Sequence, residues 1–322
     1  MAQRASFRLD SFLTAILVTA VTASFLPIPE TYSTAMDGVT RIAIFGLFFL
    51  YGVRLEPNDA RAGLRHWRLH VTILLFTFGA FPVVGLGLAA LPSNLIPAAL
   101  IPGLLYLTLC PSTVQSSVNV TSLAKGNVAG AIVAATTSNL LGVVLTPALA
   151  ATLLSTTIAG AVRLDTLTTI LAQILLPFVL GQLSRRWTAA FVTRHPRLRL
   201  LDQLSILLMV YGAFSDGARE GIWAQVTGAT LLVLVGICAA LVSVMLGLTW
   251  IVGGWLGFDR GDRIAIQFCG TQKSLATGLP MATVLFAGEP VGLIVLPLMI
   301  FHQAQLLATT TVATHHARRI PG

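Results

Sequence analysis

Charged residues are scarce in this chain. They make up 10% of its 322 residues, whereas soluble domains usually carry about 25%. Hydrophobic residues make up 55%, and the mean hydropathy is +0.84. This composition is not that of an ordinary soluble domain, and it predicts a membrane protein with several spanning helices.

Motifs typical of enzymes and metal sites are also missing. The three cysteines show no paired spacing, which favours neither a disulfide framework nor a zinc site. There is no HExxH or GxSxG motif and no pair of carboxylates within an apolar run. Lys273 and Ser274 are adjacent, but neighbours on a helix point about 100° apart and do not face each other. We therefore expect no catalytic residues and no enzyme activity.

Long apolar runs, in contrast, follow one another along the whole sequence. A spanning helix needs about 20 mostly apolar residues, and ten runs meet this requirement. The linkers between them are short, so we expect residues 1–322 to form a single transmembrane unit. The predicted spans are residues 9–27, 38–54, 71–92, 95–123, 127–154, 165–184, 200–217, 224–254, 263–286 and 290–314.

The basic residues orient these spans, because cytoplasmic loops are enriched in Lys and Arg. With the N-terminus inside, sixteen of the 20 Lys and Arg residues fall in cytoplasmic segments, three fall outside, and Lys273 remains within a span. The net charge of +8 therefore indicates topology and not nucleic-acid binding. We expect an integral protein of a bacterial inner membrane, surrounded by the lipid bilayer, with both termini in the cytoplasm.

Two of the predicted spans are interrupted in their apolar pattern. In the fourth, LTLCPSTVQSSVNVTS (107–122) carries Pro111 among hydroxyl and amide side chains. In the ninth, CGTQKSLATGLP (269–280) carries Gly270, Gly278 and Pro280. Because proline and glycine weaken or break helices, we expect both spans to be broken at these places.

The two breaks occupy the same place in the two halves of the chain. Each lies in the fourth span of a five-span half, and an odd number of spans gives the halves opposite orientations in the membrane. Inverted-repeat transporters have this pattern, and their interrupted spans mark the binding site. We therefore predict an all-α polytopic membrane protein with a 5+5 inverted repeat and crossing broken helices. Repeat 1 covers about 9–154 and repeat 2 about 165–314.

At these residues the sequence resembles the bile acid:sodium symporter family, solute carrier family 10, and within it the SBF-like branch. The resemblance is carried by residues 110–149 with the Lys125-Gly126-Asn127 turn, by residues 269–282, and by the triplet Phe301-His302-Gln303. It implies a core domain of spans 3–5 and 8–10 that moves against a panel domain of spans 1, 2, 6 and 7. It also implies a secondary active transporter that moves a small organic anion by alternating access, coupled to sodium.

The resemblance further implies a sodium site where the two breaks meet. The residues expected in this ion-site region are Gln115, Ser116, Ser117, Asn119, Thr136, Thr137, Gln272 and Lys273. Two positions depart from the family, because Phe268 replaces a glutamate and Lys273 replaces an uncharged amide. A hard cation relies on oxygen ligands and their charge. An ammonium about 4 Å away repels it by about 4 kcal/mol at an effective dielectric of about 20. We therefore expect sodium coupling to be weak or absent.

Two other functions stay open on the sequence. One is a sodium-coupled organic anion symporter with altered ligands. The other is a channel-like protein, or a membrane regulator that moves no solute itself. Saturable uptake with counterflow would distinguish a carrier from a channel and from a regulator.

Lys273 has four possible roles. No carboxylate lies within a span to pair with it, and burying a lone charge costs about 2.5–3.5 kcal/mol. Its ammonium could replace a bound sodium ion, held by helix-end carbonyls and by polar side chains around the breaks. It could instead bind an anionic substrate or carry a proton. The fourth possibility is a lysine that serves packing alone or snorkels to the membrane surface.

The expected substrate cavity lies beside the same breaks. Its candidate residues are Lys273, Ser274, His302 and Gln303. His302 is either hydrogen-bonded within the helix bundle, or it lines the cavity and shuttles protons. These side chains and the ion-site residues together define the region in which we expect function to reside.

Overall fold

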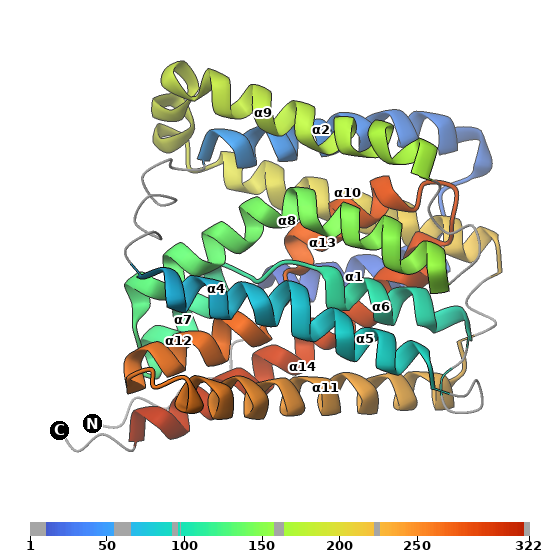
Figure 1. The fold of residues 1–322 in the computed structure, drawn as a ribbon. Helices are drawn as coiled ribbons and strands as arrows, with labels where there is room; N and C mark the ends of the chain where they lie inside the picture. The colour runs from blue at the N-terminus through green and yellow to red at the C-terminus, as the bar shows by residue number, and fades with distance from the viewer. Residues whose placement is uncertain are drawn as a thin grey trace.

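The computed structural model describes residues 11–54, 66–91, 96, 98–157, 164–221 and 226–318. Within these ranges the chain forms helices and their connections and no strand, so the all-helical prediction is confirmed. Most of the helices run side by side along one direction (Figure 1). Six helices in the described part are long and apolar enough to span a membrane: Glu30–Arg54, Trp67–Ala89, Val128–Leu154, Leu198–Arg219, Gly228–Trp255 and Val291–Arg318.

The helices follow the chain in two series. The first is α1 (Ser11–Phe25), α2 (Ser33–Arg54), α4 (Trp67–Leu75), α5 (Phe81–Ala89), α6 (Ile101–Leu109), α7 (Gln115–Leu123) and α8 (Val128–Thr157). The second is α9 (Leu164–Arg194), α10 (Leu198–Arg219), α11 (Gly228–Trp255), α12 (Arg260–Thr271), α13 (Leu275–Leu285) and α14 (Val291–Arg318). Short 3-10 turns, Glu30–Tyr32 and Ala98–Leu100, precede α2 and α6, and a π-helical segment, Phe76–Ala80, joins α4 to α5.

Helices α2 and α9 lie along each other at one side of the bundle, and α11 lies at the opposite side (Figure 1). Two glycines allow α2 and α9 to approach closely. A Cβ added at Gly52 would lie 2.1 Å from the carbonyl oxygen of Phe178, and one at Gly181 would lie 2.1 Å from that of Phe49. Small residues at helix contacts are typical of membrane proteins, because they let the backbones pack directly.

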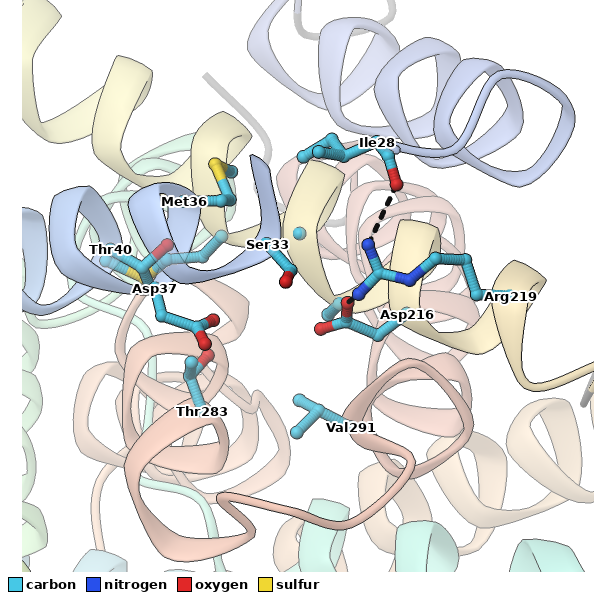
Figure 2. A pocket seen from close by; sticks show the side chains of 12 residues that line it. Ile28, Ser33, Met36, Asp37, Thr40, Asp216, Arg219, Thr283 and Val291 are labelled. Atoms are coloured by element: carbon cyan, nitrogen blue, oxygen red, sulfur yellow. Dashed lines mark hydrogen bonds and ion pairs between the residues drawn. The ribbon is translucent and has the colours of Figure 1, made fainter. Parts of the chain in front are cut away.

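At one end of the bundle, α2 and α10 meet α13 around a small pocket of about 60 Å³ (Figure 2). Arg219 donates to the carbonyl of Ile28 at 2.8 Å and forms an ion pair with Asp216. The bond to Ile28 ties the end of α10 to the connection that follows α1, and the ion pair lies within α10. Across the pocket, the side chains of Asp37 and Thr283 point toward one another, so only this small pocket lies between these helix ends.

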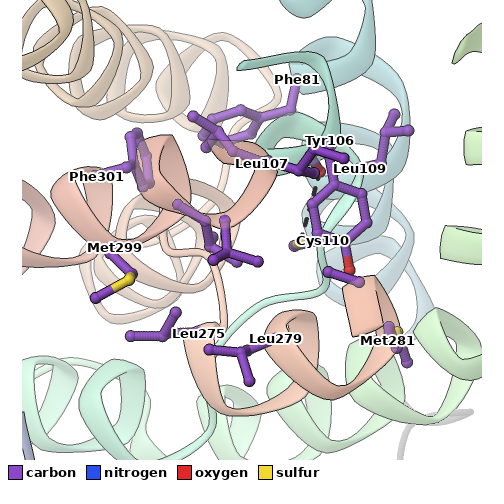
Figure 3. Packing of buried hydrophobic residues seen from close by; sticks show 14 of the residues in the cluster. Phe81, Tyr106, Leu107, Leu109, Cys110, Leu275, Leu279, Met281, Met299 and Phe301 are labelled. Atoms are coloured by element: carbon purple, nitrogen blue, oxygen red, sulfur yellow. Dashed lines mark hydrogen bonds between the residues drawn. The ribbon is translucent and has the colours of Figure 1, made fainter. Parts of the chain in front are cut away.

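Apolar side chains enclose the region where α6 ends and α13 begins (Figure 3). Phe81 on α5 packs edge-on against Phe301 on α14, with ring centroids 6.0 Å apart. Tyr106 on α6 packs edge-on against Phe286 at 5.2 Å, and its hydroxyl donates to the carbonyl of Gly278. All four rings are buried. Polar interactions inside this shell are therefore stronger than they would be in water.

Both predicted breaks are present. Residues 110–114 separate α6 from α7, and residues 272–274 separate α12 from α13. We call these segments the first and second connections, and the place where they meet the crossing. There the N–H of Ser274 donates to the carbonyl of Pro111 at 2.8 Å. The two broken helices thus satisfy part of each other's free backbone, as irregular backbone inside a membrane protein requires.

The glycines expected to break the ninth span have another role. Gly270 lies inside α12, and Gly278 and Pro280 lie inside α13, so the expectation that these residues form the break was wrong. A Cβ added at Gly278 would lie 2.8 Å from the sulfur of Cys110, so this glycine lets α13 approach the first connection. Residues 272–274 form the break instead, and the side chain of Ser274 accepts from the N–H of Thr277 and caps α13.

Candidate functional site

Lys273 lies at the crossing and is fully buried. Its ammonium donates three hydrogen bonds of 2.8 Å, to the carbonyl oxygens of Thr77, Thr108 and Cys110. We call these three oxygens the carbonyl cage. The ring of Phe81 covers the ammonium from a further side, with Nζ 4.1 Å from the ring centroid, which is a cation–π contact. An ammonium has three donors, so all of them are used.

The local sequence explains why the carbonyl of Thr77 is free to accept. In the π-helical segment, the N–H of Phe81 bonds back five residues, to the carbonyl of Phe76. The next donor in this pattern would come from Pro82, which has no N–H. The carbonyl of Thr77 therefore lacks a backbone donor and turns to Lys273. Segments of π-helix often occur at functional sites.

The other two oxygens of the carbonyl cage belong to the end of α6. The last carbonyls of a helix have no partner within it and carry partial negative charge. Here α6 ends because Pro111 cannot donate, and the backbone at Cys110 becomes extended with ψ 149°. The ammonium of Lys273 therefore binds where a helix end favours a cation.

Gln272 precedes Lys273 and forms hydrogen bonds with polar side chains of the fourth predicted span. Its Oε1 accepts from the hydroxyls of Thr113, Ser116 and Ser117 at 3.2, 2.5 and 3.0 Å. Its Nε2 donates to the hydroxyl of Thr309 on α14 at 3.2 Å. Three residues of the predicted ion-site region, Ser116, Ser117 and Gln272, are thus brought together by direct hydrogen bonds.

Gln305 on α14 braces the backbone of Lys273. Its Oε1 accepts from the N–H of Lys273 at 2.8 Å, and its Nε2 donates to the carbonyl of the same residue at 2.9 Å. Nδ1 of His302 lies 2.7 Å from Nε2 of Gln305 and 3.3 Å from the carbonyl oxygen of Lys273. Helix α14 thereby supplies the hydrogen bonds that the break removes from this peptide.

A cavity of about 1190 Å³ opens beside the crossing, between α1, α2, α9 and α10 on one side and α7, α8, α13 and α14 on the other. The predicted site residues that line it are Gln115, Ser116, Asn119, Thr136, Ser274, His302 and Gln303. Ser117, Thr137, Gln272 and Lys273 lie outside this lining. Lys273 is behind the cavity wall, and its ammonium points to α6 and the π-helical segment.

The polar groups of the cavity favour an anion. Val114 and Ser274, the N-cap residues of α7 and α13, line it, and helix N-termini attract negative charge. Arg54 and Arg199 line it as well, together with Asp202, which forms an ion pair with Arg54.

The remaining wall of the cavity is largely apolar. Its apolar lining residues are Phe12, Ile16, Val114, Val120, Leu140, Val143, Phe178, Ile206, Leu275, Ala276, Leu306 and Leu307. Concave sites with an apolar wall and a few placed polar groups are typical of small-molecule binding. The combination suits an amphipathic ligand with an anionic group.

Side chains of α8 form hydrogen bonds to the first connection, and sequence reasoning missed the residues that do so. Ser138 accepts from the N–H of Ser112 at 3.0 Å. Asn139 donates to the carbonyl of Ser112 at 2.5 Å and accepts from the hydroxyl of Thr277 at 2.7 Å. The prediction names Thr136 and Thr137 for this helix, whereas the side chains that bond to the crossing come from the next two residues.

Backbone groups and α14 account for the other residues that were missed. Thr77, Thr108 and Cys110 act through carbonyl oxygens, which every residue type carries. A signal for Thr77 exists in the sequence, since Pro82 follows it by five residues within the third predicted span. Gln305 and Thr309 lie four residues apart on one face of α14, a spacing that indicates a shared polar face.

The oxygen atoms expected to bind a sodium ion at the crossing have hydrogen-bond partners within the chain. The hydroxyls expected to bind one donate to Gln272, and the carbonyl cage is taken by the ammonium of Lys273. None of these partners is a carboxylate, and no group of three or more His, Cys, Asp or Glu side chains among the described residues could hold a metal ion. Phe268, which stands where the resemblance implies a glutamate, is buried with its ring centroid 6.5 Å from that of His316.

Broken helices that cross inside an apolar bundle, beside a cavity between two groups of helices, define a membrane transport protein. Comparison with known families agrees, because the model of the SBF-like CPA transporter family matches residues 10–318. The chain belongs to this family, the SBF-like branch of the bile acid:sodium symporter family, and the resemblance read from the sequence is confirmed.

Relatives of the chain are similar over most of its length. "Uncharacterized protein PA2026" of Pseudomonas aeruginosa is 45% identical, and the match covers 98% of this chain and 95% of the relative. "Putative symporter YfeH" of Escherichia coli is 39% identical, with 97% and 94% covered. "Sodium/bile acid cotransporter 7" of Mus musculus is 34% identical, with 84% and 80% covered.

Proposed function

We propose that the protein is a secondary active transporter that moves an amphipathic organic anion across the membrane by alternating access. One observation carries this proposal. The cavity of about 1190 Å³ is lined by the N-terminal ends of α7 and α13, the second halves of the two broken helices, and by helices from the opposite side of the bundle. A ligand in this cavity would therefore contact two groups of helices that can move relative to each other.

The packing of the helices supports a division into two domains. Helix α1 packs along α10, and α2 packs along α9. These four helices correspond to the predicted spans 1, 2, 6 and 7 and form the panel of our proposal. The remaining helices, including both broken ones, form the core. We propose that they complete ten spans in two inverted repeats, with the crossing between the repeats.

The charges at the cavity support an anionic substrate. Two arginines, Arg54 and Arg199, face one carboxylate, Asp202. The two helix N-termini at Val114 and Ser274 add partial positive charge to the cavity wall. The apolar part of the wall is suited to the hydrophobic part of the same molecule.

The conformation suggests which side the cavity faces. The cavity reaches the ends of α2 and α10 that carry Arg54 and Arg199, and the distribution of basic residues predicts that these ends are cytoplasmic. The opposite ends of α2 and α10 close against α13 around the small pocket (Figure 2). We propose that the structure represents the inward-facing state of a protein in a bacterial inner membrane, with both termini in the cytoplasm.

Transport by purified protein in liposomes tests this proposal. We expect saturable uptake of a labelled amphipathic anion and acceleration by unlabelled anion on the other side. The variant Ser274→Leu should lower uptake, because it removes the N-cap of α13 and places an apolar side chain in the cavity wall. Ser243→Leu, on an exposed part of α11, is the matched control and should behave like the unchanged protein.

Three other results would contradict the proposal. Flux that rises linearly with concentration without counterflow would indicate a channel. Absence of flux for every amphipathic anion tested, in protein that unfolds cooperatively, would indicate a regulator that moves no solute. Equal uptake by Ser274→Leu and Ser243→Leu would place the substrate elsewhere.

A further inference from the structure

We infer that the ammonium of Lys273 is a tethered internal cation that takes the place of a coupling ion at the crossing, so that the transporter operates without sodium. The inference deepens the proposed function, and its claim that transport needs no sodium rests on that function. Its claim that the ammonium takes the place of a bound cation can be tested without measuring transport.

The first argument is the coordination of the ammonium. Three carbonyl oxygens surround Nζ at 2.8 Å each, and they come from two separate parts of the chain. Oxygen ligands of this kind are those that a hard cation prefers. The ammonium thus has the ligands that an ion would use, and it joins the π-helical segment to the end of α6 and to the second connection.

The second argument is the burial of the charge. Lys273 has an exposed fraction of 0%, and none of the groups that bind its ammonium carries a negative charge. A charge inside a membrane protein is costly unless its donors are all matched. Here the three carbonyl oxygens and the face of Phe81 provide the match, as they would for a bound ion.

The geometry argues against the other roles of Lys273. Its ammonium points away from the cavity, so it does not contact a substrate there. It is held within the bundle by groups from α6 and the π-helical segment, which is not the environment of a lysine that snorkels to the surface. Its three N–H groups all donate to carbonyl oxygens, so loss of a proton would leave one of these oxygens without its donor.

The third argument comes from Gln272. The hydroxyls of Thr113, Ser116 and Ser117, which the family resemblance assigns in part to sodium, converge on its Oε1. A neutral amide oxygen thus organises the hydroxyls, and the neighbouring lysine supplies the positive charge. Gln272 bonds to these hydroxyls and Lys273 bonds to the carbonyl cage, so both groups of oxygen atoms at the crossing have partners within the chain.

A tethered cation cannot dissociate, and this has a consequence for transport. An ion that binds and leaves links substrate movement to its own gradient. The ammonium of Lys273 stays with the second connection in every state, so the crossing is charged and assembled whether or not sodium is present. We therefore expect the cycle to proceed at the same rate when sodium is replaced by another cation.

Thermal unfolding of the purified full-length protein tests the inference without an activity measurement. The variants are Lys273→Ala, which vacates the carbonyl cage, and Lys125→Ala, which removes the other lysine of the chain from a helix connection. The unchanged protein and both variants are unfolded at equal ionic strength in N-methyl-D-glucamine chloride, in sodium chloride and in ethylammonium chloride. The ethylammonium ion is the probe for the vacated cage.

The expected results differ between the variants. For the unchanged protein, the unfolding midpoint should not differ among the three salts. The same should hold for Lys125→Ala. Lys273→Ala should have a lower midpoint, which rises saturably with ethylammonium. A saturable rise of the midpoint of the unchanged protein with sodium would overturn the inference. So would a Lys273→Ala protein that is as stable as the unchanged protein and responds to no cation.

A second measurement covers the case in which Lys273→Ala does not fold. Uptake by the unchanged protein in liposomes is compared with sodium and with N-methyl-D-glucamine at equal ionic strength. Equal rates support the inference, and a rate that follows the sodium gradient overturns it. If the unchanged protein carries no anion at all, the proposed function fails, while its unfolding midpoint in sodium still decides whether a sodium site exists.

Discussion

The ring of Phe81 lies 4.1 Å from the ammonium of Lys273, on a side that the carbonyl cage leaves uncovered. Replacing this ring by an aliphatic side chain, as in Phe81→Leu, removes the cation–π contact and keeps the site apolar. A desolvated contact of this kind contributes about 2 kcal/mol. We therefore expect Phe81→Leu to lower the free energy of unfolding by about that amount beyond the effect of lost volume.

Phe286→Leu is the control for lost volume. Phe286 is also buried and packs edge-on against one aromatic ring, that of Tyr106, whereas Phe81 packs against Phe301. The free energies of unfolding of both variants are measured by denaturant titration in the same detergent. Equal losses for the two variants would show that the ring of Phe81 does not stabilise the ammonium.

Gln305 provides a second test, because it binds both peptide groups of Lys273. Gln305→Leu leaves a buried N–H and a buried carbonyl without this partner, and each unsatisfied group costs about 1–3 kcal/mol. We expect a clear loss of stability, measured as a lower unfolding midpoint. Gln303→Leu, two residues earlier on the same helix, faces the cavity and should change the midpoint little. A similar loss for both would mean that Gln305 does not brace the break.

The sequence predicts where the chain breaks better than what holds the broken ends. Pro111 and the polar residues after it indicate the first break, and Lys273 is the one basic residue that the topology cannot place in a loop or at a span end. The carbonyl cage could not be predicted in the same way. Its oxygens belong to the backbone, and the π-helical segment that frees one of them depends on how Pro82 is accommodated.

The missed residues on α8 show a different limit of sequence reasoning. Successive helix residues point about 100° apart, so a shift of one or two positions selects another face. The prediction chose Thr136 and Thr137, and the structure directs Ser138 and Asn139 to the first connection. Hydroxyl and amide side chains occupy all four positions, so residue type does not determine which of them face the first connection. Tertiary packing determines it.

The contact between α2 and α9 predicts a strong effect of a small substitution. In Gly52→Ala the added methyl group would lie 2.1 Å from the carbonyl oxygen of Phe178, so the two helices must separate. Overpacking of this kind costs about 1–3 kcal/mol. Gly46→Ala, on the same helix, has nothing within 4 Å of the added methyl group. It should be neutral, or stabilising by up to about 1 kcal/mol, because alanine favours helix.

Unfolding midpoints of the two glycine variants decide this prediction. If α2 and α9 form one rigid pair within the panel, Gly52→Ala should unfold well below Gly46→Ala. Midpoints that agree within error would mean that α2 and α9 can shift apart at no cost, and the panel would not behave as a unit.

The closed end of the bundle predicts a reversible lock. Asp37 on α2 and Thr283 on α13 point toward one another across the small pocket (Figure 2), and they belong to the proposed panel and core. Cysteines at both positions, joined by oxidation, should hold this end closed and stop uptake, and a reductant should restore it. The native cysteines, Cys110, Cys238 and Cys269, are fully buried and can stay in place.

A second cysteine pair within the panel separates locking from damage. A Cβ added at Gly212 on α10 would lie 4.0 Å from Cγ of Met36 on α2, the atom that a cysteine sulfur at position 36 would replace, so cysteines at these positions would join two panel helices. Because panel helices move together in an alternating-access cycle, oxidation of this pair should leave uptake unchanged. Full uptake by protein that is completely crosslinked between positions 37 and 283 would show that this end does not open during transport.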